Sequence, residues 1–330
     1  MKLKQTILKS TSIKSLLQAQ EEFLADALPY KVIFKRYFLA DEAGAKELPQ
    51  EEGAVSHIIQ KPLDGSAAGV WIVLAADADV SYGNRRTIVC ENGRTHCFDT
   101  DILAAGPDSH AQTQGILEAY ENSLQQDGMT IEANCLRTWF FVHDIDNNYA
   151  GLVKARRDNF TQQGLTKDTH YIASTGIAGS PVDPSKLVHM DAYAVKGPFE
   201  QRYLYAPTHL NPTYEYGVTF ERGVRADFGE LSCTLISGTA SINNKGEVVH
   251  VGDVQAQAAR MLENVEVLLA EAGHSWDGVG AILVYIRNAE DYAKVEAIFS
   301  QRFPGKPYII LKAPVCRPTW LIEIECISVQ

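Results

Sequence analysis

The sequence predicts an α+β protein built from two homologous units of the order β-β-α-β-α-β that pack together. Residues 112–160 reappear at 257–303 with nearly constant spacing, so the chain contains an internal repeat. Within each copy, apolar residues recur first at helical spacing and then in short runs typical of buried strands. The length of 330 residues is also sufficient for two domains.

The composition limits the functions open to this chain. Hydrophobic residues make up 45% and charged residues 22%, as in ordinary globular proteins. The formal net charge of −11 argues against nucleic acid and anionic membranes, which both attract clustered Lys and Arg. No segment reaches the roughly 18 apolar residues of a membrane span. We therefore expect a small-molecule partner, no nucleic acid and no membrane, and a monomer or homo-oligomer.

The cysteines and the N-terminus indicate the compartment. The six cysteines form no C-x-x-C pair and have no His-rich spacing, so we expect neither disulfides nor a metal site. No phosphate-binding glycine loop appears, so we expect no organic cofactor either. The apolar residues among the first twenty are too scattered for a secretory signal. We interpret this segment as the N-terminal extension of a cytoplasmic protein.

The two copies share their helix signals. Residues 116–124 recur at helical spacing after Asp108, which suits an N-cap, and Gly128 can end the helix in the left-handed conformation. The second copy repeats this pattern before Gly273. Residues 187–192 then align with residues 321–326. Because Gly197-Pro198 follows the first copy, the predicted domains are 1–197 and 198–330.

Strands complete both units. In the second copy we expect a hairpin of strands 231–242 and 248–249 around a turn at 243–246. A buried strand at 279–286, a helix at 292–303 that Pro304-Gly305 stops, and a last strand at 320–329 follow. Residues 31–37 and 69–76 also predict strands, whereas 46–66 has turn composition and predicts a surface loop. Helices on one face of each sheet leave the other face to be covered by the second copy or another chain.

The second copy resembles the YjgF/RidA superfamily, whose fold is chorismate-mutase-like. The matching segments are 236–239, 246–248, 252–253, Gln257, 262–264 and 322–325. Within that superfamily, the tandem arrangement resembles the FkbO-type chorismatases, which have an Ala-Ser-Thr-Gly-Ile segment and a Ser-Gly-Thr-Ala-Ser-Ile strand. These appear here at 173–177 and 237–242, and an Arg two residues before a Trp is matched by Arg137 and Trp139.

The sequence also departs from the chorismatase pattern. A Tyr-Gly-Pro segment and a Pro-Ser-Phe-x-Arg-Ala stretch in that family are replaced by residues 216–223, which lack the prolines. The Asn that follows the family's Arg-x-Trp is Phe140 here. These differences concern the wall of the substrate pocket rather than the fold.

The resemblance implies cleavage of the enol-pyruvyl ether of chorismate, which begins with protonation of the vinyl carbon by a general acid. Glu323 matches the family's proposed proton donor, although a Glu on a sheet is more often solvated or ion-paired. The first copy has His189 at the matching position, so we expect one active site per chain, with His189 structural or lining the cleft.

Two substrate carboxylates require fixed cations, and Arg can bind a carboxylate bidentately. We predict Arg137 and Arg222 for this role, with Arg202, Arg156 and Arg157 as weaker candidates, although a surface ion pair is the ordinary role of such residues. The other predicted substrate-binding residues are Tyr216, Thr175, Gly238, Ala240 and Glu325.

Two residues bear on the product. Cys316, seven residues before Glu323, matches a Cys of the 3-hydroxybenzoate-forming branch, although it could be a small buried hydrophobe. Ala240 matches the branch that yields a dihydroxycyclohexadiene carboxylate. We favour 3-hydroxybenzoate and assign Cys316 to the catalytic residues, while a branch giving mixed hydroxybenzoates stays open.

Two other functions remain. Single-unit relatives deaminate imines and enamines with an Arg that follows a Pro in the penultimate strand, but here Pro307 is followed by Tyr308. A non-catalytic ligand-binding protein is the other alternative, and a pocket without perturbed carboxyl groups would favour it.

Overall fold

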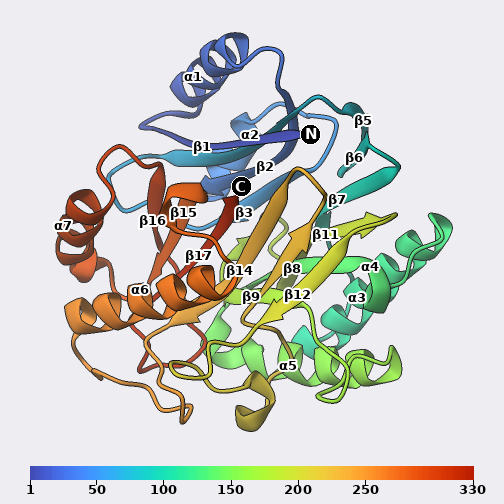
Figure 1. Cartoon of the computed structure of the whole chain (residues 1–330). Coiled ribbons are helices and arrows are strands. Elements are labelled where there is room, and N and C mark those ends of the chain that lie inside the picture. Colours follow the sequence, from blue (N-terminus) through green and yellow to red (C-terminus); the bar gives the residue numbers. More distant parts are fainter.

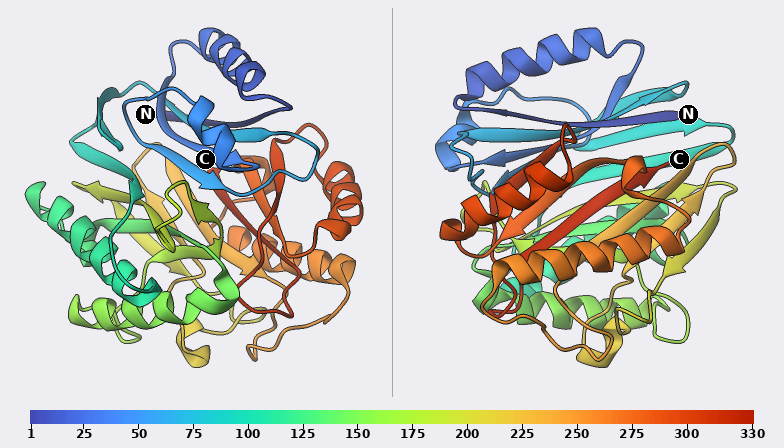
Figure 2. Two further views of the ribbon diagram at one scale, coloured as in Figure 1. Left: turned by 180° about the vertical axis from the view of Figure 1, so that it is seen from behind. Right: turned by 60° about the vertical axis from the view of Figure 1, so that its left-hand side comes forward.

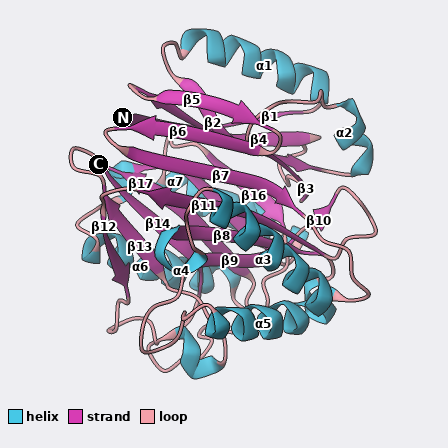
Figure 3. Cartoon of the chain, turned by 90° about the vertical axis from the view of Figure 1, so that its right-hand side faces the viewer, coloured by secondary structure: helices cyan, strands magenta, loops and turns pink.

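The computed structural model describes residues 1–330 and contains three sheets, with helices at the periphery and strands at the centre (Figures 1 and 3). No helix in the chain has both the length and the apolar character needed to cross a membrane. Each sheet belongs to one consecutive part of the chain, apart from a two-residue strand that the middle part adds to the first sheet.

The middle unit contains a six-stranded sheet in the order β5-β6-β7-β11-β8-β9. Its strands are β5 (Asp79–Gly83), β6 (Arg86–Glu91), β7 (Arg94–Ile102), β8 (Cys135–Val142), β9 (Ala173–Ala178) and β11 (Val188–Lys196). Its helices are α3 (Ser109–Gln126), the single turn α4 (Ile131–Asn134) and α5 (Ile145–Gln162). The side chain of Asp108 caps α3, and Gly128 has a positive φ after it, as the sequence predicted.

The C-terminal unit repeats this sheet strand for strand, in the order β12-β13-β14-β17-β15-β16. Its strands are β12 (Glu200–Leu204), β13 (Gly223–Asp227), β14 (Ser232–Ala240), β15 (Val279–Ile286), β16 (Tyr308–Lys312) and β17 (Ile322–Val329). Its helices are α6 (Val254–Glu271) and α7 (Tyr292–Arg302). In both units the last strand lies between the strands that precede the two long helices, which confirms the predicted repeat.

The first 76 residues form a third, shorter copy of the same unit. Its sheet order is β1-β4-β2-β3, which matches β7-β11-β8-β9 without the two outer strands. The elements are β1 (Lys2–Ser10), α1 (Ile13–Asp26), β2 (Lys31–Leu39), α2 (Glu42–Glu47), β3 (Val55–Ile59) and β4 (Ala68–Ala76), and β10 (Ser180–Pro181) pairs with β3. The chain is therefore a triple repeat, of which the sequence revealed two copies.

Some predicted elements differ from the structure. The surface loop expected at 46–66 is wrong, because it contains β3, which pairs with β2 and buries Val55 and Ile58. The expected strand at 248–249 forms only a single bridge between Ile242 and Val248. The partner of β14 in the hairpin is instead β13, which the mixed polar composition of residues 223–227 concealed.

The inner faces of the three sheets pack on one another. A cluster of 54 buried hydrophobic residues draws members from all three units, so the sheets share one core. Trp139 and Phe141 of β8 belong to it, while Phe140 and Val142 point to the opposite face against α3 and α5. Figure 2 shows the helices on the outside of this arrangement from two further sides.

Candidate functional site

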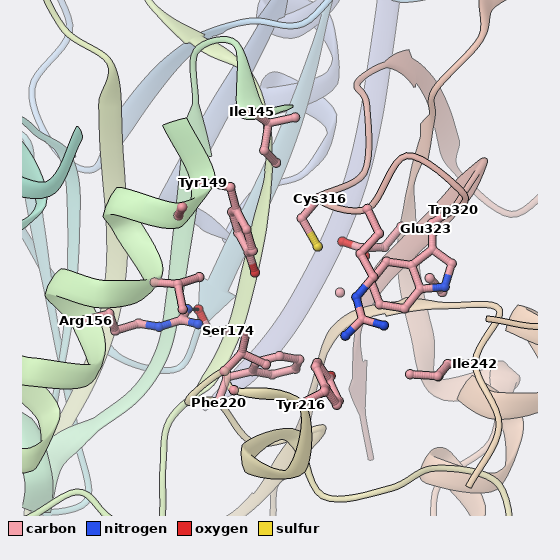
Figure 4. Close-up of a pocket in the computed structure, with 18 of the residues that line it drawn as sticks. Ile145, Tyr149, Arg156, Ser174, Tyr216, Phe220, Ile242, Cys316, Trp320 and Glu323 are labelled. Carbon is pink, nitrogen blue, oxygen red and sulfur yellow. Dashed lines mark hydrogen bonds between the residues drawn. The ribbon is translucent and has the colours of Figure 1, made fainter. Parts of the chain in front are cut away.

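A cavity of about 450 Å³ lies at the junction of the middle and C-terminal units. Its walls come from α5 and β9 on one side, and from β14, the start of β17 and the loop that precedes it on the other. The segment around η1 (Thr213–Tyr216) closes a third side. Figure 4 shows the side chains of both units converging on this space.

Glu323 enters the cavity from β17. The strand is held on both sides, because Glu323 pairs with Ala240 of β14 and with Tyr285 of β15. The side chain is only 5% exposed. Beside it lies Gly238, where an added Cβ would come within 2.3 Å of the Glu323 Oε1 atom. Glycine at 238 therefore makes room for the carboxyl group.

Burial and a neighbouring negative charge raise the pKa of Glu323 from 4.5 to about 8. The charge comes from Glu325, and the opposing effects of Arg137 and Arg222 are smaller. Because an uncharged carboxylic acid loses least on leaving water, Glu323 keeps its proton near neutral pH. This is the protonation state that a general acid requires.

Glu325 has the opposite environment. Its carboxylate forms an ion pair with Arg137 and accepts hydrogen bonds from the hydroxyl groups of Thr175 and Tyr285, the latter at 2.6 Å. Arg36 from β2 lies 3.8 Å away on the other oxygen. Both partners of this ion pair are buried, and neither is among the residues that line the cavity. Glu325 therefore acts as the centre of a buried polar network behind the site.

Arginines from both units supply the positive charge of the cavity. Arg222 is held by the Asn211 carbonyl oxygen at 2.9 and 3.2 Å, and its guanidinium lies over the rings of Tyr216 and Phe220. Arg156 of α5 is buried and donates to the Ser174 hydroxyl at 3.3 Å, but its Nε and Nη2 atoms have no partner in the protein. Orphaned buried donors of this kind fit an anionic ligand.

An aromatic and thiol surface faces these charges. Tyr149 on α5 and Cys316 in the loop before β17 project into the cavity from opposite walls (Figure 4). Burial is the main cause that raises the pKa of the Cys316 thiol to about 12, and burial also raises the pKa of Tyr149. Both groups are therefore protonated hydrogen-bond donors rather than anions. Arg317 stacks on Trp320, with its guanidinium carbon 4.7 Å from the ring centre.

The structure brings together most of the residues predicted for the site. Eight of them line the cavity: Glu323, Cys316, Arg222, Tyr216, Gly238 and Ala240, together with the weaker candidates Arg156 and Arg157. Arg137, Thr175 and Glu325 lie behind it in the buried network. Arg202 lies on β12 and donates to the Glu271 carbonyl oxygen at 3.0 Å, away from the cavity lining.

Sequence reasoning missed several lining residues. Tyr149, Phe220, Arg317 and Trp320 were not proposed, and Arg156 was ranked below Arg137. The sequence of α5 is compatible with a solvent-exposed position for Arg156. In the structure, α5 packs against the C-terminal unit, and this packing turns Arg156 toward the site. The reverse holds for Arg137, because strand alternation places it on the inner face of β8, where Glu325 neutralises it.

Comparisons with known proteins agree with this geometry. Residues 230–330 match the family model described as Endoribonuclease L-PSP. A 3-hydroxybenzoate synthase from Streptomyces hygroscopicus is 27% identical over 293 residues, which cover 78% of this chain and 80% of that protein. A crystal structure of chorismatase superposes with a TM-score of 0.71 and 18% identity, covering 99% of this chain and 98% of the other.

The structural match extends over nearly the whole chain, so the three-unit fold is that of the chorismatase structure. The sequence match extends over most of the chain, and the family model covers the C-terminal unit. These findings confirm the resemblance expected from the sequence motifs: the protein is similar to the FkbO-type chorismatases of the YjgF/RidA superfamily.

Proposed function

We propose that this protein is a chorismatase that cleaves the enol-pyruvyl ether of chorismate and releases pyruvate. The observation that carries the proposal is the buried carboxyl group of Glu323. Its raised pKa keeps it protonated in a cavity that two arginines, Arg156 and Arg222, also line. A cavity of about 450 Å³ is of the size that small-molecule sites have. The similarity to a 3-hydroxybenzoate synthase over most of both chains supports the same reaction.

In the proposed reaction Glu323 donates its proton to the terminal vinyl carbon. The ether oxygen and the adjacent carbon then share the positive charge of an oxocarbenium ion, and the carboxylate of Glu323 is left beside it. In the hydrolytic branch, water adds to this cation and the hemiketal collapses to pyruvate and the ring alcohol. In the branch that gives 3-hydroxybenzoate, the ring loses the elements of water, so that no net water is consumed.

The arginines orient the substrate in this proposal. Chorismate carries two carboxylates, and Arg156 and Arg222 enter the cavity from different units. An anchor at each end would fix the vinyl carbon against Glu323, and positioning of this kind lowers the barrier of the chemical step. Arg317, stacked on Trp320 and Tyr216, is a further cation of the wall.

We propose 3-hydroxybenzoate as the product. Cys316 lies in the same cavity as Glu323 and carries a protonated thiol, so it can donate a hydrogen bond to the departing oxygen. Ala240 pairs with Glu323. In the chorismatases that this chain resembles, an Ala at this position is typical of the branch that forms the diene diol. We further propose that the enzyme is cytoplasmic, because its six free cysteines suit a reducing compartment. We also propose a role in secondary metabolism and a domain boundary at 197/198.

The purified protein incubated with chorismate tests this function. Pyruvate is followed by its reduction with NADH and lactate dehydrogenase, and the ring product is separated and compared with authentic 3-hydroxybenzoate, 4-hydroxybenzoate and the diene diol. We expect equal amounts of pyruvate and 3-hydroxybenzoate. Chorismate that is recovered unchanged would reject the proposal, and pyruvate formed with the diene diol would reject only the product assignment.

A further inference from the structure

The structure contains a second cavity at the equivalent junction between the N-terminal and middle units. Its volume is about 850 Å³, and its lining includes His57, Arg85, Asp101 and His189. In the middle unit, residues Thr100 and Asp101 form a bulge of β7 opposite Asp191 of β11. In the C-terminal unit, Ser237 and Gly238 form the same bulge of β14 opposite Glu325 of β17.

The register therefore gives a residue-by-residue comparison of the two cavities. His189 occupies the position of Glu323, Asp191 that of Glu325, and Asp101 that of Gly238. The site that holds a carboxylic acid beside a glycine at one junction holds an imidazole beside a carboxylate at the other. The second cavity thus has the location of the proposed active site but a different set of side chains.

Three ligand atoms converge at its wall. The Nε2 atom of His189 lies 2.8 Å from Asp191 Oδ1 and 3.4 Å from Asp101 Oδ1, and the three atoms lie within 4.8 Å of one another. Ligands bound to one ion at about 2.0–2.2 Å are separated from each other by about 3 Å. His189 Nε2 and Asp191 Oδ1 share a hydrogen bond in this structure, and the spacing of the three atoms is also compatible with adjacent corners of a coordination polyhedron.

Outer partners hold both carboxylates in place. Arg36 binds the remaining oxygen of Asp191 at 2.8 and 3.0 Å, and the Nδ1 atom of His57 lies 3.2 Å from the remaining oxygen of Asp101. Each Oδ1 atom also accepts a backbone N–H, that of Asp101 for Asp191 and that of His57 for Asp101, so both Oδ1 atoms stay near His189. Fixed outer partners of this kind are typical of metal ligands, because they set the orientation of the donor atoms.

The charge and the burial favour a cation. Asp191 and His189 are almost fully buried, and Asp101 lies at the cavity wall. Three carboxylates, Asp101, Asp191 and Glu325, gather here around two arginines, because Arg36 is shared between Asp191 and Glu325 and Arg137 is paired with Glu325. Buried carboxylates are either paired with cations or coordinate metals.

We propose that Asp101, His189 and Asp191 bind a divalent transition-metal ion of the zinc type, with the coordination completed by water from the second cavity. One imidazole nitrogen and two carboxylate oxygens suit zinc better than the all-oxygen sites of magnesium or calcium. The ion would join β7 to β11 beside the N-terminal unit, at a junction that lacks the acid of the other cavity. Its role is structural, and it takes no part in chorismate cleavage.

Calorimetric titration of the full-length, metal-depleted protein with Zn²⁺ tests the site. We expect one ion per chain, and a loss of affinity of at least about tenfold in Asp101→Asn and in His189→Gln. The control is His209→Gln, which removes an imidazole paired with Glu263 elsewhere on the surface and should leave the titration unchanged. Circular dichroism and thermal melting of each variant establish that it is folded.

A second measurement identifies the ligands. Co²⁺ bound at this site should give visible d–d bands without a thiolate charge-transfer band, and Asp101→Asn, which is nearly isosteric, should remove them. Wild-type protein that binds neither Zn²⁺ nor Co²⁺ would overturn the proposal, and so would thiolate bands or binding that persists unchanged in Asp101→Asn. Chorismate cleavage by the metal-free protein should equal that of the loaded protein, so the result is independent of the proposed function.

Discussion

Glu323 and Glu325 lie two positions apart on β17 and share one face of the sheet, yet only Glu325 has cationic and hydroxyl partners. The ionised Glu325 raises the pKa of Glu323, while its own charge is neutralised by Arg137. Environments that separate the protonation states of two carboxyl groups in this way are a recurring basis of acid catalysis.

Replacement of Glu323 tests this division of roles. Glu323→Gln keeps the shape of the side chain but removes the transferable proton, so pyruvate release should fall by about 10² or more while chorismate still binds. The rate is measured with the lactate dehydrogenase assay and binding by calorimetry. Glu263→Gln, an exposed substitution on α6, is the control. An unchanged rate in Glu323→Gln would mean that the acid lies elsewhere.

The pH dependence follows from the raised pKa. The active form of Glu323 is protonated, so activity should decline as the pH rises through about 8. The folded protein binds this proton more tightly than the unfolded chain, so the contribution of Glu323 to stability should diminish between pH 4.5 and about 8. Urea unfolding at several pH values should show a smaller decline in Glu323→Gln. An identical decline in both proteins would contradict the assigned pKa.

Arg156 should contribute to substrate binding. Its unpartnered Nε and Nη2 atoms are available to a substrate carboxylate, so Arg156→Gln should raise KM by about tenfold or more. Steady-state kinetics with chorismate measure the change. Arg202→Gln, at an exposed position on β12, is the matched control and should leave KM unchanged. Equal KM values for Arg156→Gln and the parent would exclude this anchor.

Arg137 should act mainly on stability. Removal of its charge in Arg137→Met takes away the nearer of the two cations around the buried Glu325, and removing one partner of a buried ion pair costs about 3–5 kcal/mol of unfolding free energy. The double variant Arg137→Met/Glu325→Gln should recover part of this loss, because no buried charge is then unpaired. Chemical denaturation of Arg137→Met, Glu325→Gln and the double variant measures the coupling, and additive losses would argue against it.

Gly238 should be required for the placement of the acid. Its Ala variant puts a Cβ within 2.3 Å of the Glu323 Oε1 atom, so the carboxyl group must move and the rate of pyruvate release should fall. The comparison is Gly44→Ala in α2, whose added Cβ meets its neighbours at 3.5 Å or more, an ordinary contact. Full activity in Gly238→Ala would show that the position of Glu323 is not critical.

The sequence predicted the fold well where the repeat was visible. The helix that begins after Asp108 and the helix that ends before Gly273 have strong apolar periodicity and clear capping residues. Their positions were therefore predicted accurately. The N-terminal copy was missed because it lacks two strands and does not share the sequence motifs by which the other two copies align. The short β3 was missed because its three apolar residues are interrupted by Ser56 and His57 and are surrounded by turn-forming residues.

The candidate site was predictable only in part. Glu323, Cys316 and Gly238 lie in segments with recognisable motifs, and the structure places them in one cavity. Arg137 and Arg156 were ranked in the wrong order for cavity lining, because the sequence does not say which face of β8 or α5 meets the neighbouring unit. The group of Asp101, His189 and Asp191 was invisible for the same reason, since the fold joins segments far apart in the chain.

The three copies lie in one chain, and this affects how the protein could evolve. In an assembly of three identical subunits, a mutation that replaced the acid would enter every junction at once and abolish every site. Here the position of Glu323 in one copy is occupied by His189 in another, so the equivalent positions carry different residues within one molecule. Covalent linkage of the copies thus lets one junction retain a reactive acid while its counterpart is free to acquire a different purpose.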